Sequence, residues 1–263
     1  METIHSQYMK DGYYITPDPV FPPDVVQRAA DGMDAIRTGV YDTGVPPLDS
    51  PWNPGDDESE LCKIEMPQIA SRDVYELVSH SALGKLAAEV TGAEMVQVWW
   101  VQLLYKPVSR PEATVQTNVG WHQDRQYWST WEEGSELFTA WVAVSDVTED
   151  AGPMRFVRGS HTWGLLNQGG FFDQDHDAQR REIQPPDGAD WKETVALLPP
   201  GGVSFHEKLT FHASGPNTSI GPRRSFAIHM RTQRSRPSGD LRQSLATYID
   251  LPSHCPVVFG EMR

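Results

Sequence analysis

Cysteine is scarce in this chain, with only Cys62 and Cys255 among 263 residues. Two cysteines so far apart in sequence predict neither a disulfide framework nor a thiolate metal site, and we expect both to be free thiols. Basic residues are also few, because 22 Lys and Arg stand against 36 Asp and Glu, for a formal charge of -14. Binding to phosphates needs clustered positive charge, so nucleic acid is not an expected partner.

Long hydrophobic runs are missing as well. No stretch approaches the roughly 20 apolar residues that cross a bilayer, and the start METIHSQYMKDGYY lacks the basic-then-apolar pattern of a signal peptide. We therefore expect no membrane association and a cytoplasmic location. Hydrophobic residues make up 38% of the chain, which is enough for a packed core, and the length suits a single domain over residues 1–263.

The pattern of apolar residues changes along the chain. Helical spacing begins at Asp24 and returns over residues 72–91, with a loop rich in Pro, Gly and acidic residues at 40–60. From Met95 onward, short β-type runs alternate with turn residues, which predicts a mainly β sandwich, barrel or jelly roll with flanking helices. These runs are 95–107, 137–146, 154–157, 202–213 and 223–231.

This pattern predicts a division of the single domain. Residues 1–92 would form a helical and loop region that packs on the core, 93–235 a jelly-roll core, and 236–263 a C-terminal extension. The core would carry an acid-rich insert at 163–198, which is too long for a routine connection between strands. Such an insert is either a lid over a site or decoration, and the sequence leaves both open.

Candidate metal ligands lie in the segment GWHQDRQYW. His122 and Asp124 are two residues apart, a spacing that on a strand points both side chains to the same face. His-x-Asp alone is common by chance, but the later segment SFHEKLTFHASGPN could bring His206 or His212 alongside. Two histidines and one carboxylate on one side of iron(II) leave positions open for substrate and dioxygen.

A possible anchor for a dicarboxylate follows. The pair Arg223 and Arg224 begins eleven residues after His212, and a guanidinium binds a carboxylate through two parallel hydrogen bonds. On a strand, Arg224 would share an apolar face with residues such as Phe226, whereas Arg223 would share a more polar face with residues such as His229.

The segments HQD, WVAVSDVTEDAGPMRFVRGSH and HASGPNTSIGPRRSFAIHM, with the opening YMKDGYYI, resemble motifs of the phytanoyl-CoA dioxygenase family in the same order. The resemblance implies a double-stranded β-helix, the cupin-like jelly roll, and a need for iron(II), 2-oxoglutarate and dioxygen. It implies His122, Asp124 and His212 as the metal ligands, with His206 near the site as the rival third ligand. It also selects Arg223 as the co-substrate arginine, with Arg224 as the fallback.

The resemblance implies further contacts to 2-oxoglutarate from Gln102, Trp141 and Ser214, although Gln102 departs from the apolar residue expected at its position. Lys106, just before a proline at a strand end, is expected to be solvated unless it reaches a carboxylate. His161 could act in catalysis or cap a loop, and both interpretations stay open.

The implied activity is a non-haem iron dioxygenase that oxidises an unactivated C–H bond of a small molecule and releases succinate and CO2. Hydroxylation, desaturation, epimerisation and ring closure all fit. Halogenation does not, because the related halogenases have a small residue where this chain has Asp124.

The aromatic residues Tyr127 and Trp128, together with His206, are candidate substrate contacts and suit a neutral or cationic molecule, as in a tailoring step of natural product biosynthesis. Two alternatives remain: a cupin-type divalent-metal isomerase or hydrolase that does not use 2-oxoglutarate, and a non-catalytic jelly roll that binds a metabolite. The sequence does not predict the oligomeric state.

Overall fold

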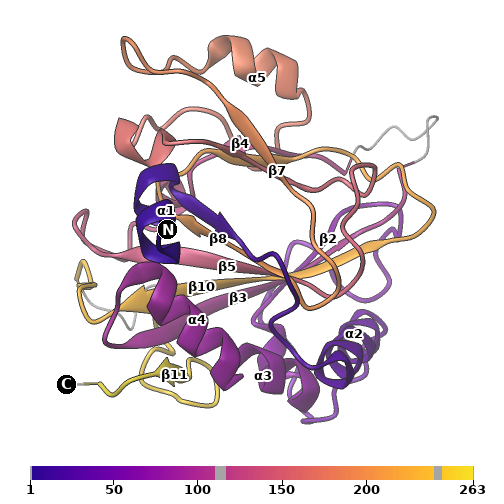
Figure 1. Ribbon diagram of the computed structural model, residues 1–263. Coiled ribbons are helices and arrows are strands. Elements are labelled where there is room, and N and C mark those ends of the chain that lie inside the picture. Colours follow the sequence, from indigo (N-terminus) through magenta and orange to yellow (C-terminus); the bar gives the residue numbers. More distant parts are fainter. Residues whose placement is uncertain (1, 110–116, 240–244, 263) are drawn as a thin grey trace.

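Two antiparallel sheets face each other in the computed structural model, which describes residues 2–109, 117–239 and 245–262 (Figure 1). The larger sheet has the order β1 (Tyr13–Ile15), β8 (Val203–Glu207), β5 (Leu137–Ala143), β10 (Arg223–Thr232), β3 (Val96–Lys106) and β11 (Val257–Phe259), and β2 (Cys62–Glu65) also pairs with β3. The smaller sheet has the order β4 (Val119–His122), β9 (His212–Ser214), β6 (Met154–Val157) and β7 (Glu193–Ala196).

Helices cover the outer face of the larger sheet. In Figure 1, α2 (Pro23–Arg37), α3 (Arg72–Val78) and α4 (Ser81–Thr91) lie below this sheet and the smaller sheet lies above it. The helices at 24–37 and 72–91 lie where the sequence predicts them, whereas α1 (Ile4–Asp11) was not predicted. Proline begins α2, and Ser71 caps α3 by accepting a hydrogen bond from the backbone N–H of Val74.

Strand alternation divides the larger sheet into two chemically different faces. Along β10, Phe226, Ile228 and Met230 point toward the helices and join the largest apolar cluster of the protein. The alternate residues, such as Arg223 and His229, point toward the smaller sheet. The expected mainly β fold with flanking helices, a double-stranded β-helix, is confirmed, and its inner faces are where a site can be built.

The insert after Trp163 carries α5 (His176–Glu182) and β7, and it docks on β4. The backbone N–H of Gly120 donates to the Phe171 carbonyl (3.0 Å), and the Gln179 side chain bonds both the N–H (2.7 Å) and the carbonyl (3.3 Å) of Trp121. A Cβ on Gly120 would lie 2.3 Å from the Gly170 carbonyl oxygen, so only glycine permits this close approach.

The C-terminal segment is part of the core. Ala246, Ile249 and Cys255 pack in an apolar cluster with Trp99 and Trp128, and β11 pairs with β3. Cys62 and Cys255 are buried free thiols.

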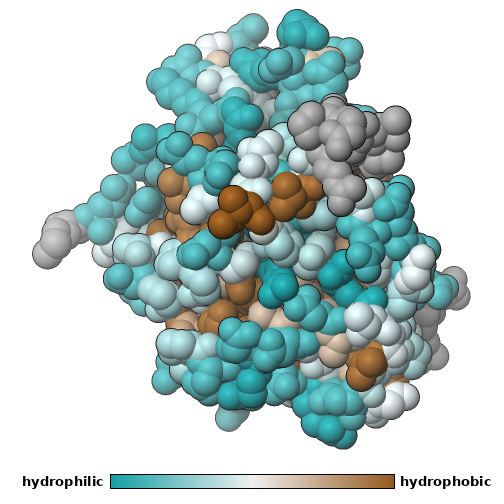
Figure 2. Space-filling model, turned by 90° about the vertical axis from the view of Figure 1, so that its right-hand side faces the viewer, coloured by the Kyte–Doolittle hydropathy of each residue, from teal (hydrophilic) through white to brown (hydrophobic). Residues whose placement is uncertain are grey.

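The face shown in Figure 2 is mainly hydrophilic, with small apolar patches. No helix within the described residues is long and apolar enough to span a membrane.

Candidate metal centre

A cavity of about 820 Å³ lies between the two sheets and is lined by residues of both. Its walls also include residues of the 40–60 loop, the insert and the C-terminal segment, such as Leu48, Phe171 and Tyr248. Small-molecule sites typically occupy 300–1,000 Å³, so the space suits a co-substrate together with a substrate.

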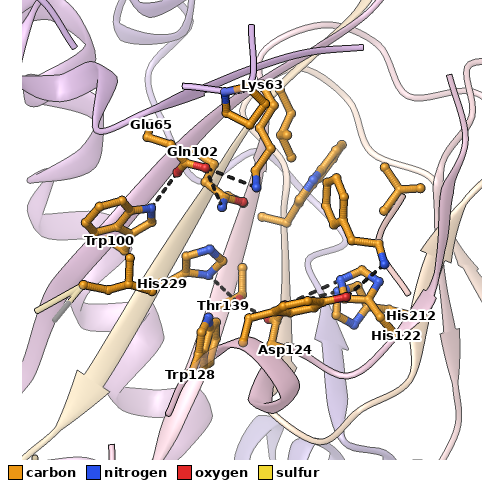
Figure 3. Close-up of a pocket in the computed structure, with 18 of the residues that line it drawn as sticks. Lys63, Glu65, Trp100, Gln102, His122, Asp124, Trp128, Thr139, His212 and His229 are labelled. Carbon is orange, nitrogen blue, oxygen red and sulfur yellow. Dashed lines mark hydrogen bonds and ion pairs between the residues drawn. The ribbon is translucent and has the colours of Figure 1, made fainter. Parts of the chain in front are cut away.

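His122, Asp124 and His212 meet on one wall of this cavity. One ligand atom from each lies within 4.8 Å of the others, and all three residues are buried. His122 ends β4 and His212 begins β9, where the two are paired across the sheet. The sequence predicts Asp124 on the same strand as His122, but Asp124 instead begins a short 3-10 helix (Asp124–Tyr127). That turn brings the carboxylate back beside the two imidazoles (Figure 3).

Backbone carbonyls fix the tautomer of both histidines. The Nδ1 of His122 lies 2.8 Å from the Gly120 carbonyl oxygen, and the Nδ1 of His212 lies 2.9 Å from that of Thr210. A carbonyl only accepts, so each Nδ1 carries the proton and each Nε2 presents a lone pair. These two Nε2 atoms lie 3.7 and 3.6 Å from Asp124 Oδ1. Three lone pairs that converge with no proton between them fit a shared cation.

The other oxygen of Asp124 is already engaged. Oδ2 accepts hydrogen bonds from Thr139 Oγ1 (2.7 Å) and His206 Nε2 (3.1 Å). The Thr139 hydroxyl in turn accepts from Nδ1 of His229 at 2.8 Å. These bonds orient the carboxylate so that only Oδ1 faces the two imidazoles. Because His206 Nε2 donates a proton to Asp124, it has no lone pair on that atom for a metal.

Burial and neighbouring charges set the ionisation that a metal requires. Burial lowers the pKa of His122, and burial with the nearby His122 and His206 rings lowers that of His212 well below its usual value. Burial alone would raise the pKa of Asp124, but His212 and His206 hold it well below its usual range. At neutral pH the wall thus offers two neutral imidazoles and one carboxylate, the donor set of non-haem iron(II) sites.

A basic end of the cavity lies beside this wall. Arg223 is fully buried, donates to the Gly152 carbonyl (2.6 Å) and lies 5.0 Å from the Trp141 ring centroid. Lys106 lies directly opposite Arg223 in the β3–β10 register but does not itself line the cavity. Its ammonium donates to Ser214 Oγ (2.7 Å) and to the carbonyls of Ser214 (3.2 Å) and Gly215 (2.5 Å).

Burial lowers the pKa of both cations, to about 9 for Arg223 and well below the usual value for Lys106, where Arg223 adds to the effect. Within the described residues neither has an acidic partner, and the Nε of Arg223 lacks a hydrogen-bond acceptor. Two buried cations without a carboxylate fit an anionic co-substrate.

The two arginines of the RR pair diverge. Arg224 forms an ion pair with Asp34 of α2 at 3.0 Å, on the helix side of the sheet, whereas Arg223 lines the cavity. Ser214 and Trp141 line the basic end with Arg223. The expectation that Lys106 is solvated is wrong, because β3 runs through the sheet interior and its inward-facing lysine is 0% exposed.

Aromatic residues form the part of the wall beside His122 and His229. Tyr127 is half-exposed and lies 5.9 Å from the His122 ring, and Trp128 is buried against His229, with centroids 4.9 Å apart. Phe171 of the insert lies 5.3 Å from His122. Gln102 lines the cavity and donates to Glu65 at 3.3 Å.

His161 does not line the cavity. Its Nε2 lies 3.0 Å from the Met9 carbonyl oxygen, which ties a short helix to α1. This contact supports the loop-capping interpretation.

Sequence reasoning missed several residues of the site, among them the polar residues Lys63, Glu65, Thr139 and His229. For two of them a signal was present, because Thr139 shares its strand face with Trp141, and His229 with Arg223. The strand that carries Lys63 and Glu65 is only four residues long and has no recognisable pattern.

Residues 8–225 match the family model of phytanoyl-CoA dioxygenase (PhyH). The chain belongs to the phytanoyl-CoA dioxygenase family. Its cofactors are therefore iron and the co-substrate 2-oxoglutarate, which the metal wall and the basic end of the cavity fit. No curated protein matches the chain.

Solved structures of this kind share the fold at low identity. The 2-oxoglutarate-dependent carbocyclase SnoK of nogalamycin biosynthesis superposes with a TM-score of 0.68 at 21% identity, covering 92% of this chain and 88% of SnoK. The epimerase SnoN of the same pathway gives 0.67 at 19% identity over 90% of this chain and 84% of SnoN. EvdO2 from Micromonospora carbonacea, solved with 2-oxoglutarate, gives 0.62 at 19% identity over 90% of this chain and 92% of EvdO2.

Proposed function

We propose that the protein is an iron(II)- and 2-oxoglutarate-dependent dioxygenase that oxidises an unactivated C–H bond of a small molecule in natural product biosynthesis. One observation carries this proposal: three proton-free ligand atoms, from His122, Asp124 and His212, converge in a cavity whose neighbouring end is lined by the buried Arg223. Within the described residues, neither Arg223 nor the adjacent Lys106 has an acidic partner. A cupin-type hydrolase would need the first feature but not the second.

Each part of the cavity then has a role. His122, Asp124 and His212 hold iron(II), and Thr139 and His206 restrict Asp124 to one coordinating oxygen. When iron and 2-oxoglutarate are bound, they supply oxidative decarboxylation to succinate and CO2 and the oxidation of a C–H bond. The chain's own contribution is to orient these groups and to exclude water from them.

The basic end binds the far carboxylate of 2-oxoglutarate. Arg223 provides a two-pronged contact, with Ser214 and Trp141 beside it. Lys106, whose three donors bind Ser214 and Gly215, adds a positive charge behind Ser214 without contacting the carboxylate. The contact of Gln102 with 2-oxoglutarate remains a prediction, and its amide already donates to Glu65.

The substrate occupies the aromatic part of the cavity, against Tyr127, Trp128 and His206. SnoN has been solved with Fe3+, 2-oxoglutarate and a nogalamycin compound, which supports a natural product as substrate. Because related enzymes include an epimerase and a carbocyclase, the oxidation here is hydroxylation or one of these outcomes. Asp124 occupies the position that a halide would need, so halogenation is not expected.

Succinate formation tests this function. The full chain with iron(II), ascorbate and oxygen is expected to convert 2-oxoglutarate slowly to succinate even without substrate, and His122→Ala or Asp124→Ala is expected to abolish the conversion. Arg223→Ala should mainly raise the 2-oxoglutarate requirement, while the matched Arg224→Ala should not. A raised requirement in Arg224→Ala alone would move the anchor by one residue, and full turnover in Asp124→Ala would contradict the assigned ligands.

A further inference from the structure

An ion pair faces the metal ligands from across the cavity. Lys63 and Glu65 lie on β2, with Nζ 3.1 Å from Oε1 and side chains only 15% and 11% exposed. Figure 3 shows both on the wall opposite His122 and His212.

The Glu65 carboxylate is fixed by hydrogen bonds and can still accept a further hydrogen bond from a ligand. Trp100 Nε1 donates to its Oε2 at 2.6 Å, and Gln102 Nε2 donates to its Oε1 at 3.3 Å. A carboxylate has about four acceptor sites, so at least one remains for a ligand. Lys63 has three donors, one of which Glu65 uses, and its ammonium lies 4.7 Å from the Phe171 ring centroid.

Stability does not account for this pair. A buried ion pair is often no more stabilising than apolar residues of similar size, and the surrounding wall includes apolar residues such as Leu48, Trp100 and Phe171. The edge strand β2 could carry apolar residues at both positions without a change in its pairing to β3. Polar groups that point into a cavity are instead typical of ligand recognition.

His229 adds a second acceptor to the same space. Because Thr139 donates its hydroxyl proton to Asp124, the Nδ1 of His229 must donate to Thr139. The Nε2 of His229 is therefore a lone-pair acceptor, and it has no hydrogen-bond partner within the part of the chain that the structure describes. In the β3–β10 register, His229 lies opposite Trp100, which bonds Glu65, so the two acceptors belong to neighbouring positions of one wall.

We propose that Lys63, Glu65 and His229 form a subsite that recognises a neutral, hydroxyl-bearing ring compound, such as a glycosylated or polyhydroxylated aromatic molecule. The proposal rests on the proposed function, which places the reacting C–H at the opposite wall. A hydroxyl both donates and accepts, and so satisfies Glu65 or His229 and Lys63 together. A ligand with net charge would have to separate an ion pair whose charges cancel. Trp100 and Phe171 offer flat surfaces for the ring.

Quenching of tryptophan fluorescence tests the subsite without turnover. The probes are an anthraquinone O-glucoside and its per-O-methylated form, titrated into the full chain with and without manganese(II) and 2-oxoglutarate. The wild type is expected to bind the glucoside at least tenfold more tightly than its per-O-methylated form. The neutral variant Lys63→Gln/Glu65→Gln is expected to reduce this ratio below threefold, while the control Lys85→Gln/Glu89→Gln, on the exposed face of α4, keeps it.

The proposal is overturned if the wild type does not bind the glucoside, or if it binds the glucoside and the methylated form equally tightly. It is also overturned if the ratio of the two affinities is unchanged in the Lys63→Gln/Glu65→Gln variant. The wild-type ratio decides even if that variant fails to fold. Calorimetry of 2-oxoglutarate binding to the manganese-loaded wild type tests the proposed function separately. Failure there, with the glucoside preference intact, would refute the dioxygenase and leave the subsite standing.

Discussion

Replacing Arg223 by methionine is expected to stabilise the protein in the absence of 2-oxoglutarate. Burial lowers the pKa of Arg223 from 12.5 to about 9, which corresponds to about 5 kcal/mol of unfavourable free energy for the charged form at pH 7. The substitution also removes the bond to the Gly152 carbonyl, about 2 kcal/mol, and the contact with Trp141, about 1 kcal/mol. The net gain is about 1–2 kcal/mol, or roughly 2–8 °C in Tm.

The same variant should lose its response to the co-substrate. The unfolding free energy of the manganese-loaded wild type is expected to rise by about 2.7 kcal/mol when 2-oxoglutarate is present at about 100 times its Kd, which appears as a higher Tm. Arg223→Met should show little or no shift at that concentration. The control Arg224→Met loses a partly exposed ion pair with Asp34, about 1 kcal/mol or less, and should keep the shift. A destabilised Arg223→Met that still responds to 2-oxoglutarate would refute the reasoning.

Three further predictions follow from the site. Thr139→Val removes a donor to Asp124 and should weaken metal binding about tenfold in a metal titration, with recovery in Thr139→Ser. Three cavity histidines have pKa values lowered by burial, to about 4 for His229. Below their unfolded pKa of about 6.5 the unfolded chain binds more protons, so the unfolding free energy should fall with decreasing pH. The fall is at most about 1.4 kcal/mol per pH unit for each histidine. Burial raises the pKa of Glu207 to about 7, so the protonation of this carboxylate in the folded state offsets the effect of one histidine. Urea unfolding at a series of pH values from 7 to 5 checks this, and an unfolding free energy that does not fall would contradict it. Gly120→Ala should expose the insert to limited proteolysis, because its Cβ would collide with the Gly170 carbonyl; unchanged protection would show that the contact is not needed.

Much of the fold follows from local patterns. The alternation in RRSFAIHMR predicts that Arg223 and Arg224 face opposite sides of the sheet, and in the structure one lines the cavity and the other pairs with Asp34. Helical periodicity likewise predicts α2, because its apolar stripe packs on the outer face of the sheet.

The wrong and missing parts depend on tertiary structure. Lys106 precedes a proline at the end of its strand, so local sequence favours solvent, but the opposite strand and Ser214 enclose it. Asp124 leaves the strand because the chain turns into a short 3-10 helix, which spacing alone does not reveal. Glu65 enters the site only because β2 adds to β3 across a loop of irregular sequence.

An anaerobic titration of the metal-free protein with iron(II) and then 2-oxoglutarate tests the central claim most directly. The weak visible charge-transfer band of the iron–2-oxoglutarate chelate is expected in the wild type and is expected to be absent in Asp124→Ala. Tight zinc binding without this band would favour a cupin-type enzyme that does not use 2-oxoglutarate. Failure to bind any metal would contradict the account and indicate a binding module.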